Sequence, residues 1–460
     1  MKTENIKYKD SASRAQKCAC TNSAEALPIL ERKFKNSGIP WIGMIPSDWN
    51  VVRTKNVFAC SKSLVGEDWS HTQLLSLTTK GVKEVAIGST SGKVPDSYET
   101  YQVVNKDDLV MCLFDLDCSA VFSGVSNFHG MISPAYKVLK TLDGYSPAFY
   151  GYWFDYIFDG RKYKYLSKNI RYSLTYDEFA ALGIAAPPLP TQQRIADFLD
   201  RKCAEIDELA ALQETMIAEL KRYKQSVITE AVTKGLDKNV KLKDSGEEWI
   251  GEIPSHWEMK AVKYVLQRRN QKNDPIISEE RLSLSIGVGI TKYADKTTNL
   301  DRFKDDFTQY QLAYPDDIVL NSMNMIVGAV GKSAFMGCVS PVYYVMIPKN
   351  SIESTYYSYL LNTPRIRDVY HSLGKGIYAI ERGDGRVNTC RLKVSFYDFG
   401  RIEIPVPPNQ EQQQINVFLQ RKCAEIDELI AIKQQKIEAL KEYKKSVIFE
   451  YVTGKKEVAI

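Results

Sequence analysis

The chain has 460 residues, of which 44% are hydrophobic and 25% are charged. This length is about three times that of a typical domain, so we expect two or three packed units. The composition excludes a disordered, collagen-like or supercharged protein. A net charge of only +5 permits a nucleic-acid partner without requiring one, so local clusters of charge must decide.

The cysteines and histidines predict no metal or disulfide chemistry. The nine cysteines include no CxxC pair, and none of the four histidines stands in an HExxH spacing, so we expect no metal site. The first ten residues, MKTENIKYKD, carry charge where a signal peptide is apolar, which favours a cytoplasmic protein. The most apolar stretch, residues 326–348, is interrupted by Lys332 and Pro341 and fits two buried strands joined by a turn, not a membrane span.

The strongest signal is an internal repeat. WIGMIPSDW at 41–49 returns as WIGEIPSHW at 249–257, and RKCAEIDEL at 201–209 recurs letter for letter at 421–429. The first pair is displaced by 208 residues and the second by 220, so the second half has gained 12 residues between these markers. We predict an internal pseudo-twofold repeat of one fold, whose diverged segments carry two different surfaces.

In chain order, short β-rich runs such as DLVMCLF alternate with turn residues, and each diverged segment closes with a Tyr-rich helical stretch, near 149–154 and 356–361. The predicted class is therefore α+β, with two similar domains joined by two long helices. The predicted division is a mobile segment 1–33, a first domain 34–186, a central helical region 187–236, a second domain 237–405, a C-terminal helical region 406–453 and a tail 454–460.

The two near-identical regions read as long helices that follow Pro187-Pro188 and Pro407-Pro408. Apolar residues alternate at three and four positions, as in a coiled-coil seam, and about 40 residues form a rod of roughly 60 Å. The simplest arrangement packs the two rods on each other, and the alternative lays each helix on its own domain. The predicted helix–helix interface contains Leu199, Ile206, Leu209, Leu220, Tyr223, Val227, Leu419, Ile426, Leu429, Leu440, Tyr443 and Val447.

Motifs of catalysis are absent from the sequence. There is no GxxxxGK[ST] or GxGxxG loop, no GxSxG, and no Asn/Asp-Pro-Pro-Tyr/Phe motif of an amino-methyltransferase. The carboxylate pairs Asp107-Asp108 and Asp316-Asp317 precede apolar strands at equivalent places, where turn formation explains them. We therefore predict no catalytic residues in this chain.

Two basic clusters lie at corresponding places before the long helices. Residues 160–172, GRKYKYLSKNIRY, hold five cations and no acid, and residues 365–393 combine Lys and Arg with Gly-rich runs. Such segments can hold phosphates and present Arg to base edges, although a solvated basic face is the alternative for each. The predicted DNA-binding residues are Arg161, Lys162, Lys164, Lys168, Arg171, Tyr172, Lys375, Tyr378, Arg382 and Arg386.

Each half of the chain has the same order of markers: SGxxWIGxIPxxW, then a diverged module, then PP…QQ with a long helix. This repeated order resembles the DNA-specificity subunit of type I restriction-modification systems, over about residues 34–453. This resemblance implies two target-recognition domains that each read one half of a split, asymmetric DNA sequence. It also implies that the two helical regions form an antiparallel coiled coil and dock two methyltransferase subunits. The first copy departs from the family's pattern, with Thr191 where the second has Glu411, and we expect Thr191 to serve as a helix N-cap.

The resemblance further implies a non-catalytic subunit of a type I restriction endonuclease and adenine-N6 DNA methyltransferase complex, whose restriction subunits cleave unmodified double-stranded DNA. The chain itself is then expected to bind no cofactor, while S-adenosylmethionine, ATP and Mg belong to partner subunits. Two alternatives from other classes are a single-chain restriction or methylation enzyme and a coiled-coil scaffold that reads no sequence. The missing motifs argue against the first, and the diverged modules argue against the second.

Overall fold

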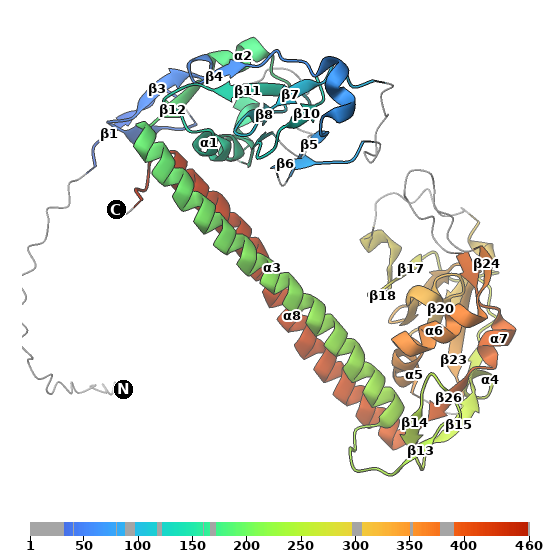
Figure 1. The fold of residues 1–460 in the computed structure, drawn as a ribbon. Coiled ribbons are helices and arrows are strands. Elements are labelled where there is room, and N and C mark those ends of the chain that lie inside the picture. Colours follow the sequence, from blue (N-terminus) through green and yellow to red (C-terminus); the bar gives the residue numbers. More distant parts are fainter. Residues whose placement is uncertain are drawn as a thin grey trace, which may run out of the picture.

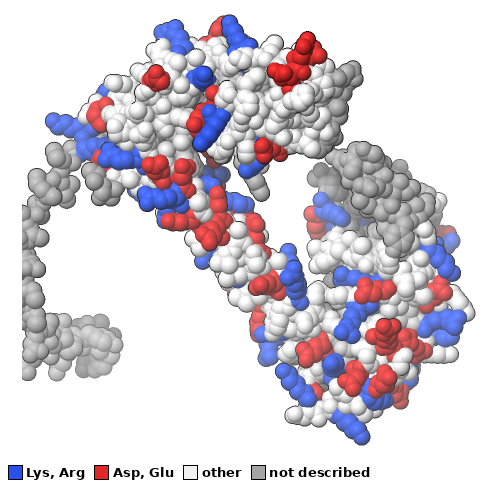
Figure 2. All heavy atoms as spheres, in the orientation of Figure 1, with Lys and Arg blue, Asp and Glu red and all other residues white. Residues whose placement is uncertain are grey.

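The computed structural model describes residues 32–39, 41–79, 81–87, 97–116, 122–159, 161–165, 172–296, 306–349, 353–377 and 391–458. Two domains of mixed helix and strand stand at opposite ends of a rod made of two long helices (Figure 1). Both domains project from the same side of the rod and leave open space between them (Figures 1 and 2). The predicted α+β fold with two similar domains and paired long helices is confirmed.

The first domain is built on a four-stranded antiparallel sheet in the order β4 (Phe58–Cys60), β11 (Lys137–Thr141), β8 (Leu109–Met111) and β9 (Ser123–Val125). Four antiparallel pairs surround it: β1 (Phe34–Asn36) with β2 (Met44–Pro46), β3 (Asn50–Arg53) with β12 (Gly183–Ala186), β5 (Leu75–Thr78) with β6 (Gly81–Glu84), and β7 (Gln102–Val104) with β10 (Gly130–Ile132). The helices are α1 (Pro147–Asp159) and α2 (Tyr176–Ala181), with short 3-10 turns η1 (Thr54–Asn56), η2 (Gly66–His71) and η3 (Lys162–Tyr165).

The second domain repeats this plan with the sheet β16 (Leu266–Arg268), β23 (Tyr343–Pro348), β20 (Ile318–Asn321) and β21 (Val330–Lys332). The matching pairs are β13 (Leu242–Asp244) with β14 (Glu252–Pro254), β15 (Glu258–Ala261) with β26 (Glu403–Val406), β17 (Leu282–Ser285) with β18 (Gly289–Lys292), and β19 (Gln311–Ala313) with β22 (Gly337–Val339). The helices are α4 (Val262–Val265), α5 (Ser354–Leu360), α6 (Pro364–Leu373) and α7 (Phe396–Gly400), with turns η4 (Tyr293–Asp295), η5 (Phe307–Gln309) and η6 (Met325–Val327).

The second domain also holds the pair β24 (Lys375–Ile377) and β25 (Arg391–Lys393), for which the described part of the first domain has no counterpart. This pair lies between α5 and α7, so the structure places the extra residues of the second half there. The apolar stretch 326–348 forms the three strands β21, β22 and β23, so the prediction of two strands was one strand short. No helix in the described ranges is long and apolar enough to cross a membrane.

The predicted Tyr-rich helices are α1 and α5, and each fills the core of its domain with aromatic rings. In α1 the side chains of Phe149, Tyr150, Trp153 and Phe154 are fully buried because three- and four-residue spacings place them on one face. The short helix that precedes the last strand of each domain begins with a side-chain cap, at Thr175 before α2 and at Ser395 before α7. Equivalent local signals therefore start equivalent elements.

The rod consists of α3 (Leu189–Lys234) and α8 (Asn409–Val452), of 46 and 44 residues. At about 1.5 Å per residue each helix is roughly 70 Å long. Two ion pairs fix the antiparallel direction, Lys224 to Asp427 at 2.6 Å and Lys444 to Asp207 at 2.7 Å. Each pair maps onto the other by the repeat displacement of 220, so the rod has a pseudo-twofold axis near its middle.

The buried residues of the rod recur with the spacing of a heptad. In α3 they include Gln192, Ala196, Leu199, Cys203, Ile206, Gln213, Ile217 and Ala231, and in α8 they include Gln412, Asn416, Leu419, Cys423, Ile426, Ile437 and Val447. Polar Gln213 belongs to this seam, where Lys433 Nζ lies 3.4 Å from its Oε1. The alternative in which each helix lies only on its own domain is wrong, because the helices pack on each other along this seam.

Part of the predicted interface requires correction. Leu199, Ile206, Leu419, Ile426 and Val447 are buried, and Leu220, Val227 and Leu440 are half-buried. Leu209, Tyr223, Leu429 and Tyr443 were assigned wrongly, because they are 46%, 51%, 47% and 50% exposed. Each comes one residue before a half-buried position of the helix, and these positions hold Ala210, Lys224, Ile430 and Lys444, of which only Ile430 is a large apolar residue.

Each end of the rod is part of a domain core. Ile195 and Leu199 of α3 and Val452 of α8 pack with Trp49 in the first core. At the other end Val232 of α3 and Leu419 of α8 pack with Trp257 in the second core. Because both helices enter both cores, the rod holds the two domains at a set separation.

The segment predicted to be mobile requires a second correction. Residues 1–31 lie outside the described residues, but Arg32 stacks on the Trp49 ring at 5.8 Å and donates to the Gly454 carbonyl at 3.0 Å. Arg32 therefore belongs to the first domain.

Candidate DNA-reading and docking surfaces

The predicted basic cluster of the first domain is divided between two surroundings. Lys164 lies over the Tyr172 ring at 5.0 Å, and Arg161 is exposed at the start of η3. Lys162 instead lines a pocket of about 540 Å³ at the junction of the domain with α8, beside Trp41, Asp159, Glu442 and Phe449. Lys162 is therefore half-buried beside the rod, whereas Lys164 is exposed, and DNA contact by Lys162 stays a prediction.

Of the four DNA-binding residues predicted in the second cluster, only Lys375 lies within the described residues. Lys375 is exposed in β24 with its Nζ 4.0 Å from Asp398 Oδ2. Lys168, Arg171, Tyr378, Arg382 and Arg386 lie outside the described residues. In the described residues coloured in Figure 2, cations and acids are interspersed over the rod and both domains. DNA contact by the basic clusters stays a prediction.

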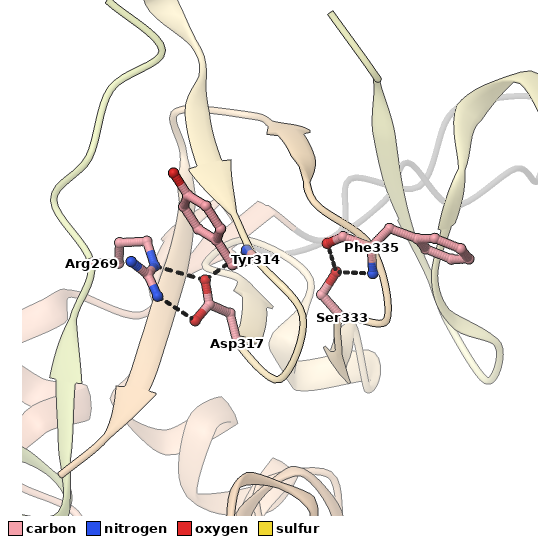
Figure 3. A network of polar contacts seen from close by, with 5 residues as sticks. All are labelled: Arg269, Tyr314, Asp317, Ser333 and Phe335. Atoms are coloured by element: carbon pink, nitrogen blue, oxygen red, sulfur yellow. Dashed lines mark hydrogen bonds and ion pairs between the residues drawn. The ribbon is translucent and has the colours of Figure 1, made fainter. Parts of the chain in front are cut away.

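The paired aspartates form turns and carry no catalytic geometry. Asp316 adopts a left-handed φ of 70°, and Asp317 accepts from the Tyr314 backbone N–H at 2.8 Å (Figure 3). Arg269 clasps Asp317 through two hydrogen bonds, Nε to Oδ2 at 2.8 Å and Nη2 to Oδ1 at 3.0 Å, while its guanidinium stacks over Tyr314. The neighbouring Ser333 hydroxyl closes a second turn by donating to the Phe335 carbonyl (Figure 3).

The first domain has the same turn without the arginine. Asp107 has a φ of 69°, and buried Asp108 accepts from the Asn105 N–H at 2.7 Å. Burial raises the pKa of the Asp108 carboxyl above its usual value, and the nearby Lys140 offsets only part of this effect. The turn of the second domain therefore encloses the ion pair of Asp317 with Arg269, whereas the corresponding turn of the first domain encloses the Asp108 carboxyl, whose charge is only partly compensated.

This difference predicts opposite results for the same substitution. Asp317→Asn should destabilise the second domain by about 2 kcal/mol, less than for a fully buried pair because Arg269 is partly exposed. Asp108→Asn should change stability by less than about 0.5 kcal/mol, since the amide oxygen can still accept from Asn105. Denaturant unfolding with domain-resolved hydrogen exchange measures both, and equal losses in the two domains would contradict the assignment.

The pH dependence supplies the control for Asp108. Because its pKa is raised on folding, the folded first domain binds the proton more tightly than the unfolded chain. Its stability contribution therefore improves as the pH falls through the raised pKa toward the usual carboxyl pKa, and Asp108→Asn should remove this part of the pH dependence.

A glutamine at the start of each long helix links the rod to its domain. Gln192 is fully buried, accepts from the Ser146 N–H at 2.8 Å and donates to the Pro187 carbonyl at 2.7 Å. Gln412 repeats this contact with Glu353 and Pro407. The PP…QQ pattern therefore has a physical role, because one buried amide joins the helix start to the segment before α1 or α5.

The position before this glutamine differs between the halves. Glu411 accepts from the Trp257 indole N–H at 2.9 Å and lies 2.6 Å from His256 Nε2. In the first half Thr191 occupies this position, and the buried Trp49 indole N–H has no partner among the described residues. The expected role of Thr191 as N-cap is wrong, because α3 begins at Leu189 after Pro188 without a side-chain cap.

We expect Thr191→Gln to stabilise the first domain by about 1 kcal/mol, because the new amide oxygen can accept from the unpaired indole N–H of Trp49. Thr191→Leu, which adds similar bulk without an acceptor, is the matched control. Thermal unfolding monitored by tryptophan fluorescence compares the two, and an equal gain for Leu would show that packing alone is responsible.

The corrected interface residues form two exposed apolar patches on the rod. The ion pair of Lys444 with Asp207 brings the turn that holds Leu209 beside the turn that holds Tyr443. The pseudo-twofold axis repeats this patch with Leu429 and Tyr223, and the exposed Leu212 and Ile432 extend the two copies. Exposed Leu and Tyr side chains in a repeated arrangement are typical of a protein-binding surface.

The described residues contain no group of three or more His, Cys, Asp or Glu side chains able to hold a metal ion. The observed features define a class of protein with two related domains and a coiled-coil spacer, whose rod carries repeated exposed apolar patches.

Comparisons with known proteins agree with this class. A family model described as the type I restriction modification DNA specificity domain matches residues 250–442. A putative type I restriction enzyme MjaX specificity subunit from Methanocaldococcus jannaschii is 24% identical over 449 residues, which cover 92% of this chain and 97% of that protein. A chain from a structure on complex assembly and conformational transition of the type I R-M system aligns with a TM-score of 0.60 at 15% identity, covering 89% of this chain and 98% of that chain.

Residues 250–442 therefore match the type I restriction modification DNA specificity domain, and the similarity to a specificity subunit extends over 92% of the chain. These findings support a type I restriction-modification specificity subunit, a class whose role implies DNA recognition.

Proposed function

We propose that the chain reads a bipartite, asymmetric target in double-stranded DNA, one half-site with each domain, and that its rod docks two methyltransferase subunits. The observation that carries this proposal is the antiparallel rod whose two helices enter both domain cores. Two domains of the same fold but different surface sequence, held apart by a rigid spacer, suit two different half-sites with unspecified bases between them. The pseudo-twofold repeat of the apolar patches suits two copies of one partner.

In this proposal the chain is the non-catalytic member of an adenine-N6 DNA methyltransferase and restriction endonuclease complex. S-adenosylmethionine, ATP and Mg act on partner subunits, including the restriction subunits that complete the assembly. The complex would work in the cytoplasm. The rival readings, a single-chain enzyme and a scaffold without sequence reading, differ from this proposal in measurable ways.

The test is an electrophoretic shift of duplex DNA by the chain with and without its cognate methyltransferase subunit, combined with methylome sequencing of the host. The proposal expects a bipartite methylated motif and preferential binding of that motif by the assembled complex. Methyl transfer by the isolated chain would establish the enzyme reading. Binding of methyltransferase subunits with no preference for any DNA sequence would establish the scaffold reading.

A further inference from the structure

One hairpin is anchored in the same way in both domains. The hairpins β5–β6 and β17–β18 each bury three side chains in a small core: Leu75, Leu77 and Val82 in the first domain, and Leu282, Leu284 and Ile290 in the second. A glycine of the sheet lies against each hairpin, and an added Cβ at Gly124 or Gly331 would come within 2.9 Å of it. Each hairpin therefore lies directly on its sheet, with the Leu77 side chain nearest to Gly124 and the backbone of Gly289 nearest to Gly331.

The tips of the two hairpins differ in chemistry. In β5–β6 the tip is closed by the Thr78 hydroxyl, which donates to the Gly81 carbonyl at 2.8 Å. In β17–β18 the tip is Ile286-Gly287-Val288, and Ile286 and Val288 are 58% and 72% exposed. Gly287 and Gly289 have φ values of 77° and 86°, which permit the tight turn that leaves both apolar side chains in solvent.

The position of the apolar tip suits contact with DNA. Figure 1 shows both hairpins on the sides of their domains that face the open space beside the rod. At the base of the tip, Lys296 Nζ donates to the Ser285 hydroxyl at 3.1 Å, which sets a cation beside the turn where it can meet a phosphate. The major groove of B-DNA admits a two-stranded β-ribbon, and the 5-methyl group of thymine is its apolar feature.

Building on the proposed function, we propose that the tip of β17–β18 is a sequence-reading element of the second domain, in which Ile286 and Val288 contact thymine methyl groups in the major groove. The corresponding tip of the first domain is polar at Thr78. The two domains then use one anchored hairpin with different tips for different half-sites.

The experiment measures binding of the assembled complex to its methylome-defined target, in which each thymine is replaced in turn by deoxyuridine. Loss of one contacted methyl group should weaken binding by the wild-type protein about fourfold, in one half-site only. The double variant Ile286→Ser/Val288→Ser should bind the unmodified target about tenfold more weakly and show no deoxyuridine effect in that half-site. Its response in the other half-site should be unchanged.

The control is Tyr264→Ser, because Tyr264 is 64% exposed on α4, beside the sheet edge opposite to the hairpin. The Tyr264→Ser variant should bind the unmodified target and every deoxyuridine-substituted target with the same affinity as the wild-type protein. The inference is overturned if the wild type shows no deoxyuridine effect, if the tip variant keeps it, or if the variant loses it in both half-sites. A wild-type complex that does not distinguish the target from scrambled DNA would overturn the proposed function itself.

Discussion

Inserting one heptad into both α3 and α8 is expected to change the spacing of the DNA target while each half-site keeps its base preference. Seven residues lengthen the rod by roughly 10 Å, which corresponds to about three base pairs at ~3.4 Å each. Because both helices enter both domain cores, the added length must separate the domains. The preferred gap should therefore lengthen by about three base pairs, or binding should fail because the domains also rotate around the duplex.

The measurement is competition binding with a series of targets whose gap varies by single base pairs. The matched control replaces one existing heptad in each helix with another of equal length and the same seam pattern, and it should keep the original gap. If the lengthened protein still binds best at the original gap, the helices do not set the spacing.

Charging the apolar patches of the rod is expected to remove methyltransferase subunits one at a time. The double variant Leu209→Asp/Tyr443→Asp alters one patch, and Leu429→Asp/Tyr223→Asp alters its pseudo-symmetric copy. A buried carboxylate at the centre of a protein interface should weaken binding by more than about 2 kcal/mol, or roughly thirtyfold. Each double variant should then bind one methyltransferase subunit, and the combination of both should bind none.

Native mass spectrometry of the assembled complex gives the stoichiometry directly. Val417→Asp is the control for a single added carboxylate, since Val417 is 69% exposed on α8 outside both patches. Circular dichroism should show an intact rod in every variant because the altered side chains lie outside the buried seam. Two bound subunits in all variants would show that docking uses a different surface.

The overall architecture could be predicted from the sequence because the two halves of the chain repeat the same motifs. The markers at Trp41 and Trp249, and the repeated RKCAEIDEL, predicted two copies of one fold and two long helices, and both are present. Local signals sufficed for these elements, since Pro-Pro pairs precede the helix starts and heptad spacing extends over more than 40 residues. The turn role of Asp107-Asp108 and Asp316-Asp317 also followed from their position before apolar strands.

Only the tertiary structure decided which residues meet. The seam between the helices includes Gln213 of α3 and Lys433 of α8, which a search for apolar residues does not select. These polar side chains can lie in the seam because they contact each other across it. Lys162 is separated from Lys164 by the turn of η3 and by the approach of α8, which begins more than 240 residues later. Trp49 and Trp257 lie in nearly the same local sequence, but only the indole N–H of Trp257 is paired, because its acceptor Glu411 comes from the start of a distant helix.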